Sequence, residues 1–427
     1  SAAGILALRH TPAGAARGLW CGMGACFECI VTVDGKSGQR ACLVKAEPGL
    51  RVEGAPPANP APLAAPPAAL GERACDVLVV GAGPAGLSAA IAAARAGADV
   101  VVLDERAEAG GQYLKPLARS HADAAPDAQF RKGAALLAEA RAAGIAIHHG
   151  ATVWGGFAAD EIAALVDGAA VTFRPRRLVL APGAHERPVP VPGWTLPGVM
   201  TTGAMQTLAR AQRVSPADRV VIAGSGPLNL QLACELLAGS VQVAAVVEAA
   251  PKPRLAAWRE MLALARTAPD LAWDGLRMLA TLKRAGVPVL WGGTILACDG
   301  ADRFAALRVA TPAGETRIEA GAAALNMGFQ PETGLARALG CAQRFATEGP
   351  GAEIGRLEPV TDRDGRSSVA SVFAIGDGAA IGGSRVALAR GRLAGAAAAR
   401  DLGLAAPEDQ AAGRDLDRAL AFQHALW

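Results

Sequence analysis

Four of the eight cysteines lie close together near the amino end, and their spacing is the most chemically specific feature of the sequence. They follow the pattern C-x4-C-x2-C-x12-C and are Cys21, Cys26, Cys29 and Cys42. Thiolates are soft ligands that bind zinc and iron–sulfur clusters. Gly22 and Gly24 lie between the first two cysteines, where backbone N–H groups could approach the sulfurs. The pattern therefore predicts a metal centre.

The spacing also bears on which metal centre this is. Plant-type [2Fe–2S] ferredoxins carry C-x4-C-x2-C followed by a distant fourth cysteine, and four thiolates hold two irons. Residues 30–33 read as a strand and Asp34-Gly35 as a turn, which is typical of a β-grasp module. A zinc site with four cysteine ligands is the alternative, but zinc ribbons usually carry two C-x2-C pairs and only one occurs here. The sequence favours a [2Fe–2S] cluster.

A glycine-rich loop, GAGPAG, contains Gly81, Gly83 and Gly86. It follows an apolar strand-like run and opens a helix-like segment, which is the context of a dinucleotide fingerprint. Gly81 permits the tight turn, Gly83 lets the backbone meet a pyrophosphate, and Gly86 lets helix and strand pack closely. A glycine turn that caps a helix without a ligand is the alternative.

The strand after this loop ends with two carboxylates, Asp104 and Glu105. Either could accept a hydrogen bond from a ribose hydroxyl. Asp104 is favoured because a Gly-Gly pair begins six residues later, as in flavin-binding proteins. Gly111 and Gln112 in that segment are predicted to contact FAD as well.

A second fingerprint, GSGPLN, is weaker than the first. It has Gly224 and Gly226, but Asn229 stands where a third glycine is expected, and its Cβ should push helix and strand slightly apart. Glu248 ends the following strand. An acidic residue there favours a free 2′-hydroxyl, and hence NAD or another adenine nucleotide over NADP. A duplicated fold that has lost its nucleotide is the alternative.

Gly376 and Asp377 end a third strand, just before a long alanine-rich segment with helical character. In two-nucleotide flavoproteins such an aspartate binds the ribityl chain or phosphate of the flavin. By itself an aspartate after a strand is a common helix cap. Together with GAGPAG, it is predicted to contact FAD.

These motifs define the expected organisation. Residues 1–54 form a ferredoxin-like module whose start reads as the middle of a domain, and residues 55–73 form a Pro- and Ala-rich linker. The FAD-binding domain comes in two parts, 74–190 and 326–427, with a second nucleotide-binding domain, 191–325, inserted between them. The expected fold class is α/β: a two-dinucleotide-binding-domain flavoprotein, like glutathione and thioredoxin reductases, preceded by a partial β-grasp module.

Composition excludes several classes of function. The net charge is +3 without a long basic run, so nucleic-acid binding has no electrostatic basis. We expect no membrane-spanning segment, because no apolar run is long enough. The remaining cysteines occur singly and read as core residues in a reducing, cytoplasmic compartment: Cys75, Cys234, Cys298 and Cys341.

Catalytic side chains stay unknown from the sequence. No Ser/His/Asp set is recognisable, and hydride and electron transfer require no acid–base residue because the cofactors carry the chemistry. His148 and His149 are adjacent on an expected strand and point to opposite faces, so they are predicted to be solvated or core residues.

Several stretches together resemble the α subunits of heteromeric flavin-dependent amine dehydrogenases. They are RGLWCGMGACFECIVTVDG, DERAEAGGQY, LVLAPGAHERPVPVPGWTLPGVMTTGAMQTL and GFQPETGLARALGC, with the Gly376-Asp377 strand. The family includes opine oxidase, hydrogen cyanide synthase and D-hydroxyproline dehydrogenase, and heterotetrameric sarcosine oxidase is more distantly similar. His185-Glu186-Arg187 lies in the most distinctive stretch, where it either lines the flavin region or has a structural role.

The resemblance implies a division of labour. A separate β subunit, folded like D-amino-acid oxidase, would oxidise the amine on its own FAD, and this chain would take up the electrons in a hetero-oligomer. The electron acceptor is unknown; a respiratory acceptor would bring peripheral association with a membrane. Three features depart from the family: Pro182 in APGA, Asn229, and the end of the chain at Trp427 without a further cysteine-rich module. Two alternatives stay open, a self-contained NADH-dependent reductase and a scaffold with partly vacant nucleotide sites.

Overall fold

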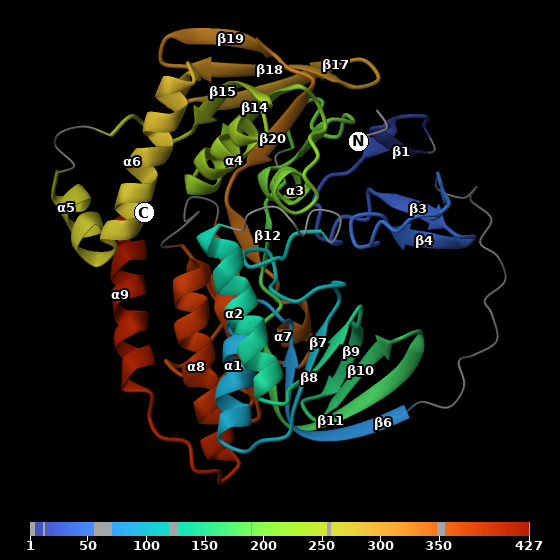
Figure 1. Cartoon of the computed structure of the whole chain (residues 1–427), viewed down its shortest axis with the longest axis vertical. Helices are drawn as coiled ribbons and strands as arrows, with labels where there is room; N and C mark the ends of the chain where they lie inside the picture. Colours follow the sequence, from blue (N-terminus) through green and yellow to red (C-terminus); the bar gives the residue numbers. More distant parts are fainter. Residues whose placement is uncertain are drawn as a thin grey trace. The chain divides into compact units, whose positions relative to one another are not determined.

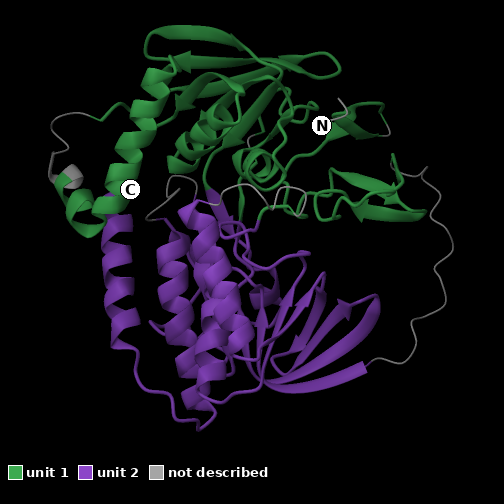
Figure 2. Ribbon diagram, viewed as in Figure 1, with its two compact units in different colours: residues 1–62, 117–122, 185–328 green, residues 63–116, 123–184, 329–427 purple. Residues whose placement is uncertain are grey.

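The structure is a computed structural model that describes residues 5–11, 13–54, 71–118, 127–188, 190–253, 258–347 and 355–426. The chain forms two compact units, which Figure 2 shows in different colours. Unit 1 comprises residues 1–62, 117–122 and 185–328, and unit 2 comprises residues 63–116, 123–184 and 329–427. Residues 55–70 of the predicted linker lie outside the described residues, and residues 71–73 belong to a strand of unit 2.

Unit 2 is built on a seven-stranded sheet with the order β8-β7-β6-β11-β10-β9, in which β24 also pairs with β11. The strands that surround β6 are parallel, whereas β9 and β10 form an antiparallel meander with β11. The strands are β6 (Gly71–Val80), β7 (Val100–Asp104), β8 (Ala146–His149), β9 (Thr152–Ala158), β10 (Glu161–Val166), β11 (Ala169–Leu180) and β24 (Val372–Ala374). A two-stranded sheet joins β22 (Gln343–Ala346) and β23 (Arg356–Pro359), and β21 spans Phe329–Pro331.

Small side chains explain how the helices of unit 2 pack. Figure 1 shows α1 (Pro84–Arg95) beside α8 (Gly383–Asp401). A Cβ at Gly391 would lie 2.3 Å from the carbonyl oxygen of Ala85, and one at Gly395 would lie 2.1 Å from that of Ala89. The two helix backbones are therefore in direct contact, which requires small side chains along this seam. The other helices are α2 (Ala128–Ala142), α7 (Gly334–Ala338) and α9 (Gln410–Leu426).

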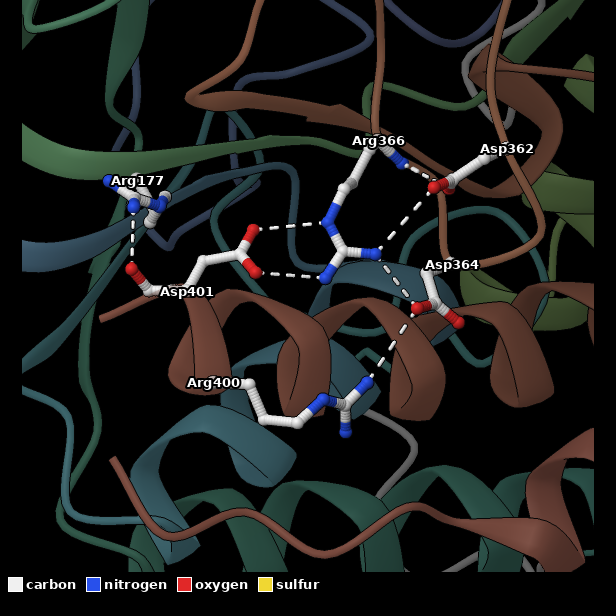
Figure 3. A network of polar contacts seen from close by, with 6 residues as sticks. All are labelled: Arg177, Asp362, Asp364, Arg366, Arg400 and Asp401. Carbon is white, nitrogen blue, oxygen red and sulfur yellow. Dashed lines mark hydrogen bonds and ion pairs between the residues drawn. The ribbon is translucent and has the colours of Figure 1, made fainter. Parts of the chain in front are cut away.

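An ionic network holds the carboxyl end of α8 in unit 2 (Figure 3). Arg366 donates two hydrogen bonds to the Asp401 carboxylate, at 2.9 and 3.1 Å, and a third to Asp364 at 2.8 Å. Arg177 of β11 donates to the Asp401 carbonyl oxygen at 2.6 Å. The bond to Asp401 is the main cause that raises the pKa of Arg366. Charge-assisted, bidentate pairs of this kind fix geometry more than they add stability.

Unit 1 contains a fully parallel five-stranded sheet with the order β13-β20-β14-β15-β16. Its strands are β13 (Val199–Thr201), β14 (Arg219–Gly224), β15 (Gln242–Glu248), β16 (Val289–Trp291) and β20 (Ala322–Asn326). An antiparallel sheet of β17 (Thr294–Gly300), β18 (Phe304–Thr311) and β19 (Gly314–Glu319) accompanies it. The helices are α3 (Thr202–Gln206), a π-helical turn (Thr207–Ala211), α4 (Pro227–Ala238), α5 (Trp258–Thr267) and α6 (Pro269–Arg284).

The amino-terminal module also belongs to unit 1. Its strands are β1 (Ala7–His10), β2 (Ala16–Gly18), β3 (Ile30–Val33), β4 (Lys36–Arg40) and β5 (Val52–Glu53). The predicted strand at 30–33 is confirmed, and Asp34 and Gly35, with φ of +48° and +76°, form the tight turn to β4. The chain passes from unit 2 to unit 1 within β12 (Ala184–Glu186), between Ala184 and His185. Among the described helices, none is long and apolar enough to cross a membrane.

Candidate functional site

The four clustered cysteines are brought together in space. Cys21 and Cys29 are buried, Cys26 and Cys42 are half-buried, and all four are free thiols. The Cys21 thiol forms hydrogen bonds with those of Cys26 and Cys42, and the Cys29 thiol with that of Cys42. Cys42 lies two residues after the end of β4, and the N–H of the intervening Ala41 donates to the Cys29 carbonyl oxygen at 2.9 Å. The returning strand thus delivers the fourth sulfur, as the spacing predicted.

These contacts divide the thiols into two easily ionised groups and two that resist ionisation. Hydrogen bonds from Cys26 and Cys42 lower the pKa of Cys21 to about 2, and the bond from Cys42 lowers the pKa of Cys29 to about 7. The same bonds raise the pKa values of Cys26 and Cys42. Thiolates are the metal-binding form, so this loop can present ligands at neutral pH.

The cluster loop, residues 20–29, also supplies backbone donors to its sulfurs. The Met23 N–H donates to Cys21 Sγ at 3.4 Å, and the Glu28 N–H to Cys26 Sγ at 3.5 Å. Phe27, between two of the cysteines, has a φ of +57°, which is costly for a bulky residue and shows that the loop is held in a set turn. N–H···S bonds of this kind tune iron–sulfur clusters. No group of three or more His, Cys, Asp or Glu among the described residues is arranged so that it could hold a metal ion, so the ligand role of the four cysteines stays a prediction.

The cluster loop is seated in the core of the second nucleotide-binding domain. Trp20 and Cys21 belong to the same buried hydrophobic cluster as Val221, Val247 and Leu325 of the five-stranded sheet. The Trp20 ring meets that of Trp194 edge to face, with centroids 5.0 Å apart. The sequence did not indicate this burial, because Trp20 carries no recognisable motif.

In unit 2, the loop at residues 81–86, the first nucleotide loop, has the geometry that its glycines predicted. Gly81 has a φ of +105°, and a Cβ there would lie 2.2 Å from the Ala181 carbonyl oxygen. A Cβ at Gly86 would lie 1.8 Å from the Gly81 carbonyl oxygen. Gly83 is the N-cap of α1, where no side chain caps the helix. The N–H groups at this helix end are therefore available to a phosphate, which fits a dinucleotide.

Of the two acidic candidates beside this loop, Asp104 is buried and Glu105 is exposed. One Asp104 carboxylate oxygen accepts from the Ala82 N–H at 2.6 Å, and the other accepts from the Arg106 N–H at 2.8 Å. The carboxylate is thereby fixed against the first nucleotide loop. Its position agrees with the preference for Asp104, although a contact with ribose stays a prediction for both residues.

The Gly110-Gly111 segment lies directly over the first nucleotide loop. The Gly110 N–H donates to the Ala82 carbonyl oxygen at 2.8 Å, and a Cβ at Gly111 would lie 2.8 Å from Gly83 Cα. Gln112 accepts a hydrogen bond from Lys115 Nζ at 3.4 Å. Lys115 is only 6% exposed, and a buried ammonium beside a phosphate-binding loop can neutralise an anion. Sequence analysis missed Lys115, because a lone lysine carries no pattern.

Gly376 and Asp377 meet the same part of unit 2. A Cβ at Gly376 would lie 2.8 Å from the Ala85 Cβ at the start of α1. Asp377 Oδ1 accepts from the Gly382 and Gly383 N–H groups, both at 2.9 Å, at the start of α8. Burial raises the pKa of Asp377, and these two bonds oppose the rise. The carboxylate therefore acts as a helix cap, and its contact with flavin stays a prediction.

The second nucleotide loop, residues 224–229 in unit 1, differs at its third position. Asn229 is fully buried, and its Oδ1 accepts a hydrogen bond from Thr202 at 2.9 Å. Its Nδ2 has no hydrogen-bond partner. Gly226 is the N-cap of α4, where again no side chain caps the helix. The uncapped helix end fits an anionic nucleotide, whereas the Asn229 Nδ2 donor is enclosed in the protein.

Glu248 lies against this loop, as predicted. Its carboxylate accepts from the Gly226 N–H at 3.3 Å and from the Ala250 N–H at 3.0 Å. Burial raises its pKa, while the bonds from Ala250, Gly226 and Ser225 lower it. The arrangement parallels that of Asp104 in unit 2, which supports the predicted duplication of the nucleotide-binding unit.

The other residues singled out by the sequence lie outside the nucleotide loops and the cysteine cluster, and the role of His185-Glu186-Arg187 stays open. Burial lowers the pKa of His148, whose ring nitrogen lies 3.2 Å from Arg73. Glu186 accepts the Gly203 N–H at 2.8 Å, near the start of α3. Burial raises the pKa values of Cys75 and Cys298 to about 12, which makes both thiols unreactive. With Cys341, they are core residues as predicted, while Cys234 is half-buried.

Comparisons with known proteins agree with this arrangement. Residues 75–403 match the pyridine nucleotide-disulphide oxidoreductase family, and residues 1–56 match a 2Fe-2S iron-sulfur cluster binding domain. The fold and the two nucleotide loops define a two-dinucleotide-binding flavoprotein, which confirms the predicted fold class. The chain belongs to the pyridine nucleotide-disulphide oxidoreductase family, which makes FAD its flavin, and its amino-terminal segment is of the [2Fe–2S] type.

Curated relatives show which proteins of this family the chain is similar to. The A subunit of opine oxidase from Agrobacterium tumefaciens (strain Ach5) is 37% identical over 77% of this chain, and its counterpart from Rhizobium meliloti is 38% identical over 77%. The HcnB subunit of hydrogen cyanide synthase from Pseudomonas aeruginosa is 35% identical over 74% of this chain and 69% of its own length. The predicted resemblance is confirmed. The chain spans 66% and 63% of the length of the two opine oxidase subunits.

Solved structures show the same fold at lower identity. L-proline dehydrogenase from P. horikoshii matches 96% of this chain and 70% of its own, with a TM-score of 0.67 and 17% identity. Thioredoxin reductase of T. acidophilum matches 77% of this chain and 99% of its own, with a TM-score of 0.56 and 19% identity. At this identity the likeness concerns the fold alone.

Proposed function

We propose that this chain is the electron-transfer subunit of a hetero-oligomeric amine or amino-acid dehydrogenase. In this account, the first nucleotide loop holds FAD and the four clustered cysteines hold a [2Fe–2S] cluster. FAD exchanges electrons in pairs or singly, and a [2Fe–2S] cluster carries one electron at a time. The observation that carries the proposal is the gathering of four cysteines: Cys21, Cys26 and Cys29 in a loop that also donates N–H groups to the sulfurs, and Cys42 after β4.

The residues of the first nucleotide loop would bind and orient the flavin nucleotide. Gly83 and the uncapped start of α1 would receive the pyrophosphate, and the buried Lys115 would add positive charge nearby. Asp104 would accept a hydrogen bond from a ribose hydroxyl, in addition to the hydrogen bonds from the backbone N–H groups that hold it. Asp377 would keep the start of α8 in place beside the flavin.

The amine substrate would be oxidised on a partner. The named relatives are subunits of opine oxidase and hydrogen cyanide synthase, and the alpha subunit of sarcosine oxidase from Corynebacterium sp. (strain P-1) matches 41% of this chain at 38% identity. We infer that the partner here is a flavoprotein folded like D-amino-acid oxidase. It would act on an opine, hydroxyproline or glycine-like amine.

The test is to produce the chain together with a flavoprotein of that fold from the same organism and to purify the complex. The expected result is a stable complex in which an amine substrate reduces the flavin and then the iron–sulfur centre of this chain. The paramagnetic signal of the reduced cluster provides the measurement. A chain that purifies with intact folding but binds neither flavin nor iron would contradict the proposal and favour a scaffold.

A self-contained NADH-dependent reductase is the second candidate, and Glu248 favours it. A buried carboxylate beside the second nucleotide loop suits the ribose of NADH. Rapid mixing of the purified chain with NADH distinguishes the two. Flavin bleaching within seconds, without any partner, would support the reductase, and its absence would support the electron-transfer subunit.

A further inference from the structure

We propose that Thr202 and Asn229 couple the cluster loop to the second nucleotide loop, so that nucleotide binding and the redox state of the cluster influence each other. Thr202 acts as the positioning residue. The inference rests on the proposed function, because it needs the cluster, and it adds a nucleotide bound at the second nucleotide loop. All the residues involved lie in unit 1.

The first link joins the cluster loop to α3. The Thr201 N–H donates to the Trp20 carbonyl oxygen at 3.0 Å, one residue before Cys21. A Cβ at Gly22 would lie 2.8 Å from Ala204 Cα, so the loop backbone rests directly on the helix. A shift of the cluster loop must therefore move α3 or break these contacts.

The second link joins α3 to the second nucleotide loop. The Thr202 hydroxyl donates to Asn229 Oδ1 at 2.9 Å, and both side chains are fully buried. The Asn229 N–H in turn donates to the Gly226 carbonyl oxygen at 3.2 Å. One hydroxyl thus connects the helix under the cluster loop to the helix end that would receive a phosphate.

The orientation of the Asn229 amide gives this link a function. Because Oδ1 is held by Thr202, Nδ2 remains as a buried donor without a partner. This donor is closed to ligand-sized atoms, and an unsatisfied buried donor is costly, so the first turn of α4 is sensitive to a shift of α3. A glycine at this position, as in the first nucleotide loop, would make no link to Thr202.

The sign of the coupling follows from the contacts of the cluster loop. Reduction adds an electron to the cluster and strengthens the N–H···S bonds at Cys21 and Cys26. We expect the tightened loop to pull on α3 and, through Thr202, to disturb the start of α4, so that a pyrophosphate binds more tightly to the oxidised state. Because coupling is reciprocal, a bound nucleotide must also lower the reduction potential of the cluster.

The experiment uses the cluster-loaded chain and ADP-ribose, which carries the pyrophosphate but no nicotinamide. We expect ADP-ribose to bind at least about fivefold more tightly to the oxidised than to the reduced protein. For a one-electron couple this ratio corresponds to a fall of about 40 mV in the midpoint potential of the cluster, measured by titration followed by EPR.

Two variants of Thr202 isolate the link. In Thr202→Val the shape is kept and the hydroxyl is lost, so the ratio should fall below about twofold. In Thr202→Ser the hydroxyl is kept, and the ratio should stay at the wild-type value. Should Thr202→Val prove too unstable to purify, Asn229→Ala removes the acceptor instead and should have the same effect.

Three results would overturn the proposal. Equal affinities of the oxidised and reduced wild-type protein for ADP-ribose would show that the cluster and the second nucleotide loop are not coupled. A ratio that persists in Thr202→Val but disappears at high salt would show that charge acts through space without Thr202. A chain that holds the cluster but does not bind ADP-ribose would overturn the coupling alone, whereas a chain that binds no cluster would overturn the proposed function as well.

Discussion

The two nucleotide loops occupy equivalent places in two similar units, yet they differ at the third glycine position. In the first loop, a Cβ at Gly86 would overlap the Gly81 carbonyl oxygen at 1.8 Å. In the second loop, Asn229 stands at that position, and its side chain is fully buried between the helix and its neighbours. The first loop therefore depends on the absence of a side chain, whereas the second loop uses one.

The surroundings of each loop account for the difference. α1 lies between its own strand and α8, with backbone contacts at Gly391 and Gly395, so it cannot move outwards. α4 is instead joined to α3 by the hydrogen bond between Thr202 and Asn229. The helix α3 also contacts the cluster loop at Gly22. The same fingerprint thus serves close nucleotide binding in one unit and, in our account, communication in the other.

The largest effect is expected for Gly86→Ala. The new methyl group would displace α1 from the strand turn, and overpacking of this kind costs about 1–3 kcal/mol in unfolding free energy. Because the phosphate-binding geometry is lost as well, the flavin content should fall at least about tenfold. The ratio of flavin absorbance to protein in the purified sample gives the measurement.

Gly275→Ala is the matched control for this substitution. Gly275 lies in α6, and a Cβ there would have nothing within 4 Å. The alanine should therefore stabilise the helix by about 0.5–1 kcal/mol and leave the flavin content unchanged. Equal flavin content in the two variants would show that the first nucleotide loop does not depend on Gly86.

Asn229→Gly, which makes the second loop resemble the first, should have a moderate effect. It leaves the buried Thr202 hydroxyl without its acceptor and places glycine in a helix, so we expect a loss of about 1–2 kcal/mol in unfolding free energy. Urea denaturation followed by circular dichroism measures this loss. A variant more stable than the wild type would show that the Asn229 side chain and its hydrogen bond to Thr202 do not stabilise the second nucleotide loop.

Asp401→Asn tests how firmly α8 is held against α1, the helix that follows the first nucleotide loop. The two Arg366 bonds would be weakened, and we expect a loss of about 1 kcal/mol. Asp415→Asn is the control, because Asp415 is half-exposed and its bond to Arg392 is 3.3 Å long. Similar unfolding midpoints for both variants would show that the network adds nothing to the position of α8.

The smallest effect concerns pH at the second loop. Burial raises the pKa of Glu248 in the folded protein, so its contribution to stability is greatest at low pH and is lost as the pH rises through the folded pKa. Relative to wild type, Glu248→Gln should therefore gain stability as the pH rises from acidic to neutral. Paired urea titrations across this range measure the trend. A difference independent of pH would contradict the raised pKa.

Local patterns in the sequence predicted much of this arrangement. The cysteine spacing, the turn at Asp34-Gly35 and both glycine-rich loops depend on residues close together in the chain, whose requirements are steric. The seat of the cluster loop could not be predicted, because it brings Trp20 against residues near positions 200, 220 and 325. Lys115 and Thr202 have no local pattern, and their roles follow only from burial and from partners distant in sequence.

The central claim is that this chain holds both a flavin and a [2Fe–2S] cluster, and iron, sulfide and flavin analysis with EPR on the reduced protein tests it most directly. The account predicts two irons, two sulfides and one FAD for each chain. It also predicts that Cys42→Ser abolishes the EPR signal, whereas Cys234→Ser, which changes none of the four clustered cysteines, retains it. Zinc in place of iron, or a signal that survives Cys42→Ser, would contradict the claim.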